Sequence, residues 1–413
     1  MFDLKGSCIL AQSGGPTSVI NASAAGVFLE AFKQNNITNV YASNHGIKGI
    51  LDEVIFDISK EDLKEIELLK TTPSSMIGSV RYKLKSYEED KTDYIKILEV
   101  FKKYNIRYFF YNGGNDSMDT INKISKFLQA ENYECMCIGI PKTIDNDLFG
   151  TDHCPGYGSA AKYIATTIME LYLDSTVYDL ESLVIVEVMG RNAGWLTAAS
   201  ELARYKGYGP DLIYLPEIPF NLNDFLNNVK KIIKAKRSGL IVVSEGLKDI
   251  TGKYIHELYQ DIQKDSFGNT QLGGCAQVLS NIVKKELGIK TRFIELSLLQ
   301  RCAQHLASKT DIEEAYNSGI MAVKFACSGI TDKMVVLKRD NSKEYKINYD
   351  LLPLEYCANT EKKLPLEWIN KDQASLSNEF INYLLPLIQG DMKAPLEDGL
   401  PRFAKLKKVL VKK

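Results

Sequence analysis

The chain has 413 residues, 45% of them hydrophobic, and its 51 basic and 52 acidic residues leave a formal net charge of −1. A chain of this length can bury a large core, which a single domain rarely accommodates, and a balanced charge gives no electrostatic reason to expect nucleic acid or an anionic membrane as the main partner. Because the eight cysteines lack paired CxxC spacing and no apolar run approaches the roughly eighteen residues that cross a bilayer, we expect a soluble, cytoplasmic protein with two lobes and reduced thiols.

Short β-rich segments alternate with helical patterns along most of the chain. SCILAQ (7–12) leads into a glycine turn and a predicted helix over 21–35, and IRYFFYNGG (106–114) leads into a second predicted helix. The same pattern, an apolar β-rich segment that ends at a polar or glycine-containing turn, recurs at CMCIGI (135–140), SLVIVEVMGR (182–191), DLIYLPE (211–217) and LIVVSEG (240–246). Unbroken apolar strands that alternate with helices are typical of a parallel sheet covered on both faces. The sequence therefore predicts an α/β fold.

Glycine-rich and polar clusters follow these strands, at the sheet edge where ligands of α/β proteins collect. Gly14–Gly15 and Gly113–Gly114 each stand between a strand and a helix, so backbone N–H groups there could cradle a phosphate. Neither pair has the spacing of a P-loop or of a dinucleotide fingerprint. Each pair alone is also compatible with a plain tight turn.

The segment PKTIDND (141–147) is more specific. Asp145 and Asp147 flank an asparagine directly after a buried strand, and Lys142 and Thr143 precede them. Alternation places the two carboxylates and Thr143 on one side, which suits a general base beside a metal or hydroxyl binder. The alternative is an Asx-rich turn with a purely structural role.

Several motifs together resemble the phosphofructokinase family, and most closely its pyrophosphate-dependent branch, from about Cys8 to about Cys327. The motifs that carry the resemblance are GSVR (78–81), GGNDS (113–117), PKTIDND (141–147), VEVMGRNAGW (186–195), VSEG (243–246) and TRFIELSLLQR (291–301). The resemblance implies two doubly wound parallel-sheet lobes with the active site between them. We expect a phosphoryl-donor lobe over 1–150 with a returning segment near 290–340, a fructose 6-phosphate lobe over 151–290, and an irregular C-terminal extension over 341–413.

The resemblance also implies an activity, the Mg²⁺-dependent transfer of a phosphoryl group to the 1-hydroxyl of fructose 6-phosphate in glycolysis. By motif position, Asp145 resembles the base that accepts the hydroxyl proton, and Arg191 resembles the residue that neutralises the transferred phosphoryl. The implied sugar-binding residues are Thr143, Ile144, Asp145, Met189, Gly190, Arg191, Glu245, Arg292 and Arg301. The implied donor-binding residues are Gly15, Arg81, Gly114 and Asn115, and the implied metal-binding residues are Asn115 and Asp147.

Asp116 and Lys142 point to the phosphoryl donor. Relatives that use ATP carry glycine at both positions, which leaves space for the α-phosphate of the nucleotide. An aspartate there opposes that phosphate by bulk and by charge, and Lys142 adds a cation beside the transferring phosphoryl. The resemblance therefore implies inorganic pyrophosphate as the donor, with Asp116 and Lys142 in the catalytic set, in a reaction that runs in either direction.

Three departures from the family pattern affect this interpretation. Asn115 stands where most relatives carry a metal-binding aspartate, Leu298 replaces a sugar-contacting His or Tyr, and Ser182 replaces an arginine that commonly crosses a subunit interface. The alternatives that stay open are an ATP-dependent phosphofructokinase, a non-catalytic regulatory subunit, and the same transfer to sedoheptulose 7-phosphate. A homo-oligomer, either dimer or tetramer, is expected by family analogy.

Overall fold

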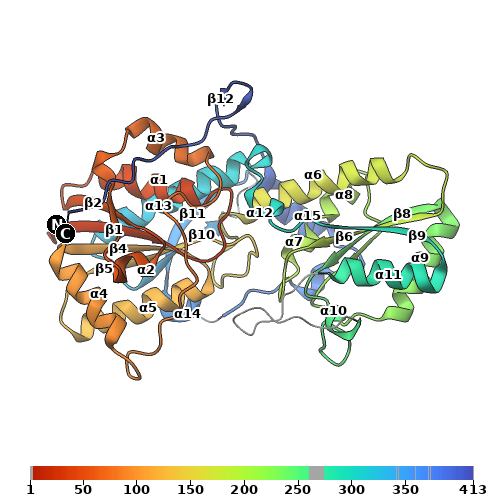
Figure 1. The fold of residues 1–413 in the computed structure, drawn as a ribbon, viewed down its shortest axis with the longest axis horizontal. Coiled ribbons are helices and arrows are strands. Elements are labelled where there is room, and N and C mark those ends of the chain that lie inside the picture. The colour runs from red at the N-terminus through yellow and green to blue at the C-terminus, as the bar shows by residue number, and fades with distance from the viewer. Residues whose placement is uncertain are drawn as a thin grey trace. The chain divides into compact units, whose positions relative to one another are not determined.

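The computed structural model describes residues 3–259, 274–340, 342, 344–358, 360–370, 372 and 374–412. The chain divides into two compact units, which we treat separately (Figure 1). Unit 1 comprises Met1–Ser159, Arg301–Lys362 and Gln389–Lys413, and unit 2 comprises Ala160–Gln300 and Lys363–Ile388. Within the described ranges, no helix combines the length and the apolar character that a membrane span requires.

Unit 1 is built on a seven-stranded sheet. In spatial order its strands are β11 (Ile347–Pro353), β10 (Lys333–Arg339), β5 (Met136–Pro141), β4 (Ile106–Gly113), β1 (Gly6–Gln12), β2 (Ile37–Ser43) and β3 (Ile55–Asp57). The central strands pair in parallel, whereas β3 and β11 at the two edges run antiparallel to their neighbours. The carboxyl ends of β1, β4 and β5 therefore meet at one edge of the sheet.

Helices cover both faces of this sheet because its strands alternate between two apolar sides. Cys8 and Leu10 face one cluster and Ile9 and Ala11 face the other. The helices of the first cluster are α1 (Ile20–Ala31), α3 (Leu63–Leu68) and α13 (Lys309–Cys327). Those on the opposite face are α2 (Ile47–Leu51), α4 (Thr92–Lys103), α5 (Asn115–Ala130) and α14 (Leu354–Cys357).

Unit 2 contains a four-stranded parallel sheet with β9 at one edge. Its strands, in spatial order, are β7 (Leu212–Tyr214), β8 (Ser238–Ser244), β6 (Ser182–Val188) and β9 (Lys290–Glu295). An apolar cluster joins this sheet to α9 (Leu222–Lys236), α10 (Ile255–Tyr259) and α11 (Cys275–Leu287). Its other helices are α6 (Tyr157–Ser175), whose first residues belong to unit 1, α7 (Trp195–Ala198), α8 (Glu201–Tyr205) and α15 (Asn378–Leu384). The α/β class predicted from the sequence is confirmed in both units.

Residues 341–413 contribute to both units. They supply the edge strand β11 and helix α14 to unit 1, then Lys363–Ile388 to unit 2, and return to unit 1 from Gln389 with β12 (Leu396–Glu397) and β13 (Leu400–Pro401). The last residues lie along β3, where the Asp57 N–H donates to the Val409 carbonyl at 2.9 Å. The short α12 (Leu299–Cys302) stands at the boundary between the two units.

Candidate active site

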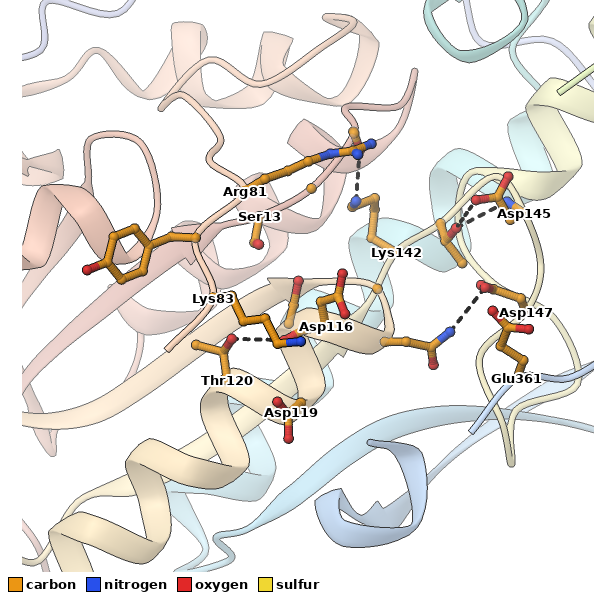
Figure 2. A pocket seen from close by; sticks show the side chains of 17 residues that line it. Ser13, Arg81, Lys83, Asp116, Asp119, Thr120, Lys142, Asp145, Asp147 and Glu361 are labelled. Atoms are coloured by element: carbon orange, nitrogen blue, oxygen red, sulfur yellow. Dashed lines mark hydrogen bonds between the residues drawn. The ribbon is translucent and has the colours of Figure 1, made fainter. Parts of the chain in front are cut away.

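A cavity of about 400 Å³ opens in unit 1 where β1, β4 and β5 end (Figure 2). The segments that line it are 13–15, 81–83, 114–117, 119–120, 142–143, Asp145, Asp147 and Glu361. One cavity is thus lined by the residues predicted to bind the donor and by residues of the loop that follows β5 (142–148), which we call the catalytic loop. This is the edge of the sheet at which the alternating pattern predicted a ligand site.

The two glycine pairs permit close packing around this cavity. Gly14 has φ +78°, a conformation that favours glycine, and a Cβ on Gly113 would lie 2.0 Å from Ser117 Oγ. Helix α5 begins at Asn115 immediately after Gly114, so its unpaired N–H groups and the positive end of its dipole lie at the cavity. The Tyr111–Asp119 stretch therefore contains the end of β4, a tight turn at the two glycines and the start of α5, which favours a bound anion.

Basic side chains gather on the other side of the cavity. Lys142 is only 3% exposed, and its ammonium donates to the Gly15 carbonyl at 2.8 Å. Burial lowers the pKa of Lys142 to about 8, Asp145 opposes this shift, and Arg81 adds to it. Arg301 reaches the same place, because a Cβ on Gly15 would lie 3.0 Å from its Nη1. Burial and the nearby Arg81 lower the pKa of Arg301. Three cations thus converge where an anion can bind.

The catalytic loop is held in shape by its own polar groups. The Asp145 N–H donates to Thr143 Oγ1 at 3.1 Å, and the buried Asn146, at φ +55°, accepts from the Cys154 N–H at 2.9 Å. Burial raises the pKa of Asp145, while the Lys142 ammonium acts in the opposite direction. A carboxylate with a raised pKa is a stronger base, provided that a neighbouring cation keeps it ionised.

Asn115 and Asp147 form an oxygen-rich corner of the cavity. Asn115 Nδ2 donates to Asp147 Oδ2 at 3.1 Å, which leaves the buried Asn115 Oδ1 without a hydrogen-bond partner. Burial, and then Asp145 and Glu361, raise the pKa of Asp147 to about 7. The described residues contain no cluster of three or more metal-ligating side chains. This corner fits Mg²⁺, which is commonly held by one or two carboxylates together with substrate phosphates.

The lining residues that were not identified from the sequence include Lys83 and Glu361. Lys83 lies two residues beyond Arg81 in an irregular segment whose Tyr82 also lines the cavity, so no period-two pattern marks it. Glu361 comes from residues beyond the matched motifs, and no local pattern marks it. It reaches the cavity because residue 361 forms an antiparallel bridge with Leu148 of the catalytic loop.

The predicted sugar-binding residues of unit 2 fall into two groups. Met189, Gly190 and Glu245 lie together at the carboxyl ends of β6 and β8, where the Gly190 N–H donates to Glu245 Oε1 at 3.1 Å. Arg191 follows them and is exposed. Arg292 instead pairs with Val184 near the start of β6 and lines a small pocket with Ser182. Arg301 belongs to unit 1, so the two predicted phosphate-clamping arginines are in different units.

Comparisons with known proteins agree on one family. The model described as "Phosphofructokinase" matches residues 7–325. The chain is 44% identical to a protein of Xanthomonas campestris pv. campestris named "Pyrophosphate--fructose 6-phosphate 1-phosphotransferase", over 99% of this chain and 98% of that protein. It is 43% identical to a protein of the same name from Halomonas elongata, over 96% and 95% of the two chains. The crystal structure of a pyrophosphate-dependent phosphofructokinase from Marinobacter aquaeolei superposes with a TM-score of 0.88 at 41% identity, covering 99% of this chain and 98% of that chain.

Proposed function

The chain belongs to the phosphofructokinase family, and we propose that it transfers a phosphoryl group from inorganic pyrophosphate to the 1-hydroxyl of fructose 6-phosphate. The products are fructose 1,6-bisphosphate and phosphate, and the reaction is reversible and serves glycolysis. The proposal rests on the shape of the donor cavity, in which Lys142 is buried against Gly15 while Asp116 faces the opening from the first turn of α5. Near full-length similarity to relatives of that name supports it.

Asp116 and Lys142 select the donor in different ways. Asp116 is an exposed acidic side chain in the cavity, so the α-phosphate of a longer donor, beyond the two phosphoryl groups that pyrophosphate has, would meet like charge. Lys142, Arg81, Gly15, Gly114 and the start of α5 bind pyrophosphate, which brings no adenosine to position it. A fixed cation beside the reacting phosphoryl acts without reorganisation and stabilises the charge that develops there.

Asp145 acts as the general base. The 1-hydroxyl gives its proton to the Asp145 carboxylate, its oxygen bonds to the nearer phosphorus, and the bond from that phosphorus to the bridging oxygen breaks to release phosphate. Lys142 and Arg191 neutralise charge on the transferred group and on the leaving phosphate. Asp147 and Asn115 Oδ1 would hold Mg²⁺, which would supply positive charge to pyrophosphate when bound. Positioning and electrostatic stabilisation account for most of phosphoryl-transfer catalysis.

Thr143, Ile144, Met189, Gly190, Glu245, Arg292 and Arg301 bind the sugar phosphate in this proposal. Glu245 accepts hydrogen bonds from sugar hydroxyls, and Arg292 and Arg301 bind the 6-phosphate with planar guanidinium groups. Since Arg292 lies on the edge strand of its own sheet, a homo-oligomer in which it serves a neighbouring copy is consistent with the family analogy. We expect the enzyme to work in the cytoplasm.

The test is ³¹P NMR of the purified protein with fructose 6-phosphate, pyrophosphate and Mg²⁺. We expect the pyrophosphate signal to decay while fructose 1,6-bisphosphate and phosphate appear in equal amounts, and the reverse reaction to form pyrophosphate. Parallel reactions with sedoheptulose 7-phosphate in place of fructose 6-phosphate show which sugar phosphate accepts the phosphoryl group while the donor stays the same. A protein that consumes no pyrophosphate with either sugar would contradict the proposal and favour the regulatory-subunit alternative.

A further inference from the structure

We propose that Glu361, on a segment remote from the family motifs, supplies the carboxylate charge that Asn115 lacks and helps to hold Mg²⁺ at the phosphoryl-transfer site. The inference rests on the proposed function, because it assigns a residue to that same site. It concerns a position that the motifs do not reach, since the family model ends at residue 325.

The segment that carries Glu361 is fixed to the catalytic loop through its backbone. Residue 361 pairs with Leu148 in an antiparallel bridge, and the Lys362 N–H donates to the Asp147 carbonyl at 2.7 Å. The Lys362 ammonium then donates to the carbonyl oxygens of Asp152 at 2.7 Å and Thr151 at 3.2 Å. The chain therefore crosses the loop directly beside the residue that we assign to the metal.

The side chain of Glu361 is directed into the cavity by this crossing. Figure 2 shows its carboxylate beside that of Asp147, with Asp145 on the same wall. Asp147 and Glu361 line the same cavity, and two neighbouring carboxylates repel one another unless a cation lies between them. A divalent cation at this place would be attracted by both.

Asn115 explains why a second metal-binding carboxylate, besides that of Asp147, is useful here. An amide offers Mg²⁺ an oxygen but no charge, and the Nδ2 group of Asn115 is already engaged with Asp147. Asp147 alone supplies one carboxylate, where one or two commonly hold Mg²⁺. Glu361 supplies a second carboxylate from a different part of the chain. The bridge between residue 361 and Leu148 uses backbone atoms, and the side chain of Glu361 is exposed.

The experiment uses Glu361→Gln, which keeps the shape of the side chain and removes its charge. Binding of Mn²⁺ to the full-length protein in the presence of inorganic phosphate is measured by EPR of the free ion. We expect the dissociation constant to rise roughly tenfold or more, as for other groups that support a metal site. Glu355→Gln, an exposed glutamate on α14 outside the cavity, is the matched control and should bind Mn²⁺ like the wild type.

A double variant tests the compensation itself. Asn115→Asp returns a carboxylate to the site, so Asn115→Asp combined with Glu361→Gln should recover most of the lost affinity. This non-additive result is expected if both residues act on the same metal ion. Circular dichroism and Tm confirm that each variant is folded. Unchanged Mn²⁺ affinity in folded Glu361→Gln, or no Mn²⁺ binding by the wild type, would overturn the inference. Wild-type Mn²⁺ binding without turnover of pyrophosphate would instead contradict the proposed function.

Discussion

The Lys142 ammonium donates to the Gly15 carbonyl at 2.8 Å and thereby joins the catalytic loop to a glycine turn 127 residues earlier in the chain. The contact fixes a buried cation at the edge of the cavity, beside Arg81 and Arg301. A site with converging cations is prepared for a small, highly charged anion. This arrangement is the physical basis of the donor assignment.

Lys142→Gln should remove the cation and lower kcat/KM for pyrophosphate by about two to three orders of magnitude, as the loss of a preorganised charge-stabilising donor does in other enzymes. In the wild type, the KM for pyrophosphate should rise as the pH passes above about 8, because the Lys142 ammonium then loses its proton. Initial-rate measurements from pH 6.5 to 9 test both points. If Lys142→Gln kept the same rise in KM with pH, another group would be responsible for it. Lys126→Gln, on the exposed side of α5, is the control and should behave like the wild type.

Asp116→Gly should weaken the use of pyrophosphate and admit ATP, because it removes the bulk and the charge that oppose an α-phosphate. Asp116→Asn separates the two effects, since it removes only the charge. The ratio of kcat/KM for the two donors is the quantity to compare among the three proteins. Full pyrophosphate activity in Asp116→Gly, with no use of ATP, would refute the role given to this residue.

Asp145→Ser should lower kcat by several orders of magnitude and leave the affinity for fructose 6-phosphate largely unchanged, since a general base acts in the chemical step. Rapid-quench kinetics give the rate of the chemical step, and calorimetric titration with fructose 6-phosphate gives the affinity. If kcat fell less than about tenfold, Asp145 would not be the base.

His153 links the catalytic loop to the core of unit 1 through buried ion pairs. Its Nδ1 lies 2.7 Å from Asp152 Oδ1 and its Nε2 lies 2.6 Å from Glu314 Oε2, while Arg339 also contacts Asp152 at 2.9 Å and Tyr345 donates to Glu314. Burial alone would lower the pKa of His153, but Glu314 and Asp152 raise it to about 9. The protonated ring therefore stabilises the folded state.

Because the folded pKa of His153 lies above the ordinary value of 6.5, its contribution is complete below about pH 6.5 and is lost as the pH rises through about 9. The contribution of His153 to the free energy of unfolding should thus decrease by roughly 3 kcal/mol over that interval. Urea unfolding at several pH values should show this slope as the difference between the wild type and His153→Gln. His256→Gln, a buried histidine whose pKa is lowered, should keep the slope.

The sequence predicted the sheet edge and the residues of the donor cavity because these depend on local order, in which a strand ends and a polar loop follows. Gly113, Asn115 and Lys142 could be placed in this way. Glu361 could not, since its position depends on pairing with a segment more than 200 residues away. The pairing of His153 with Glu314, 161 residues later in the chain, could not be predicted for the same reason, because a long-range contact leaves no periodic pattern in the sequence.

The most direct test is the initial rate of fructose 1,6-bisphosphate formation by the wild-type protein with fructose 6-phosphate and Mg²⁺, measured in parallel with pyrophosphate and with ATP. We predict turnover with pyrophosphate and none with ATP, because Asp116 and Lys142 together favour the shorter donor. Turnover with ATP but not with pyrophosphate would contradict it.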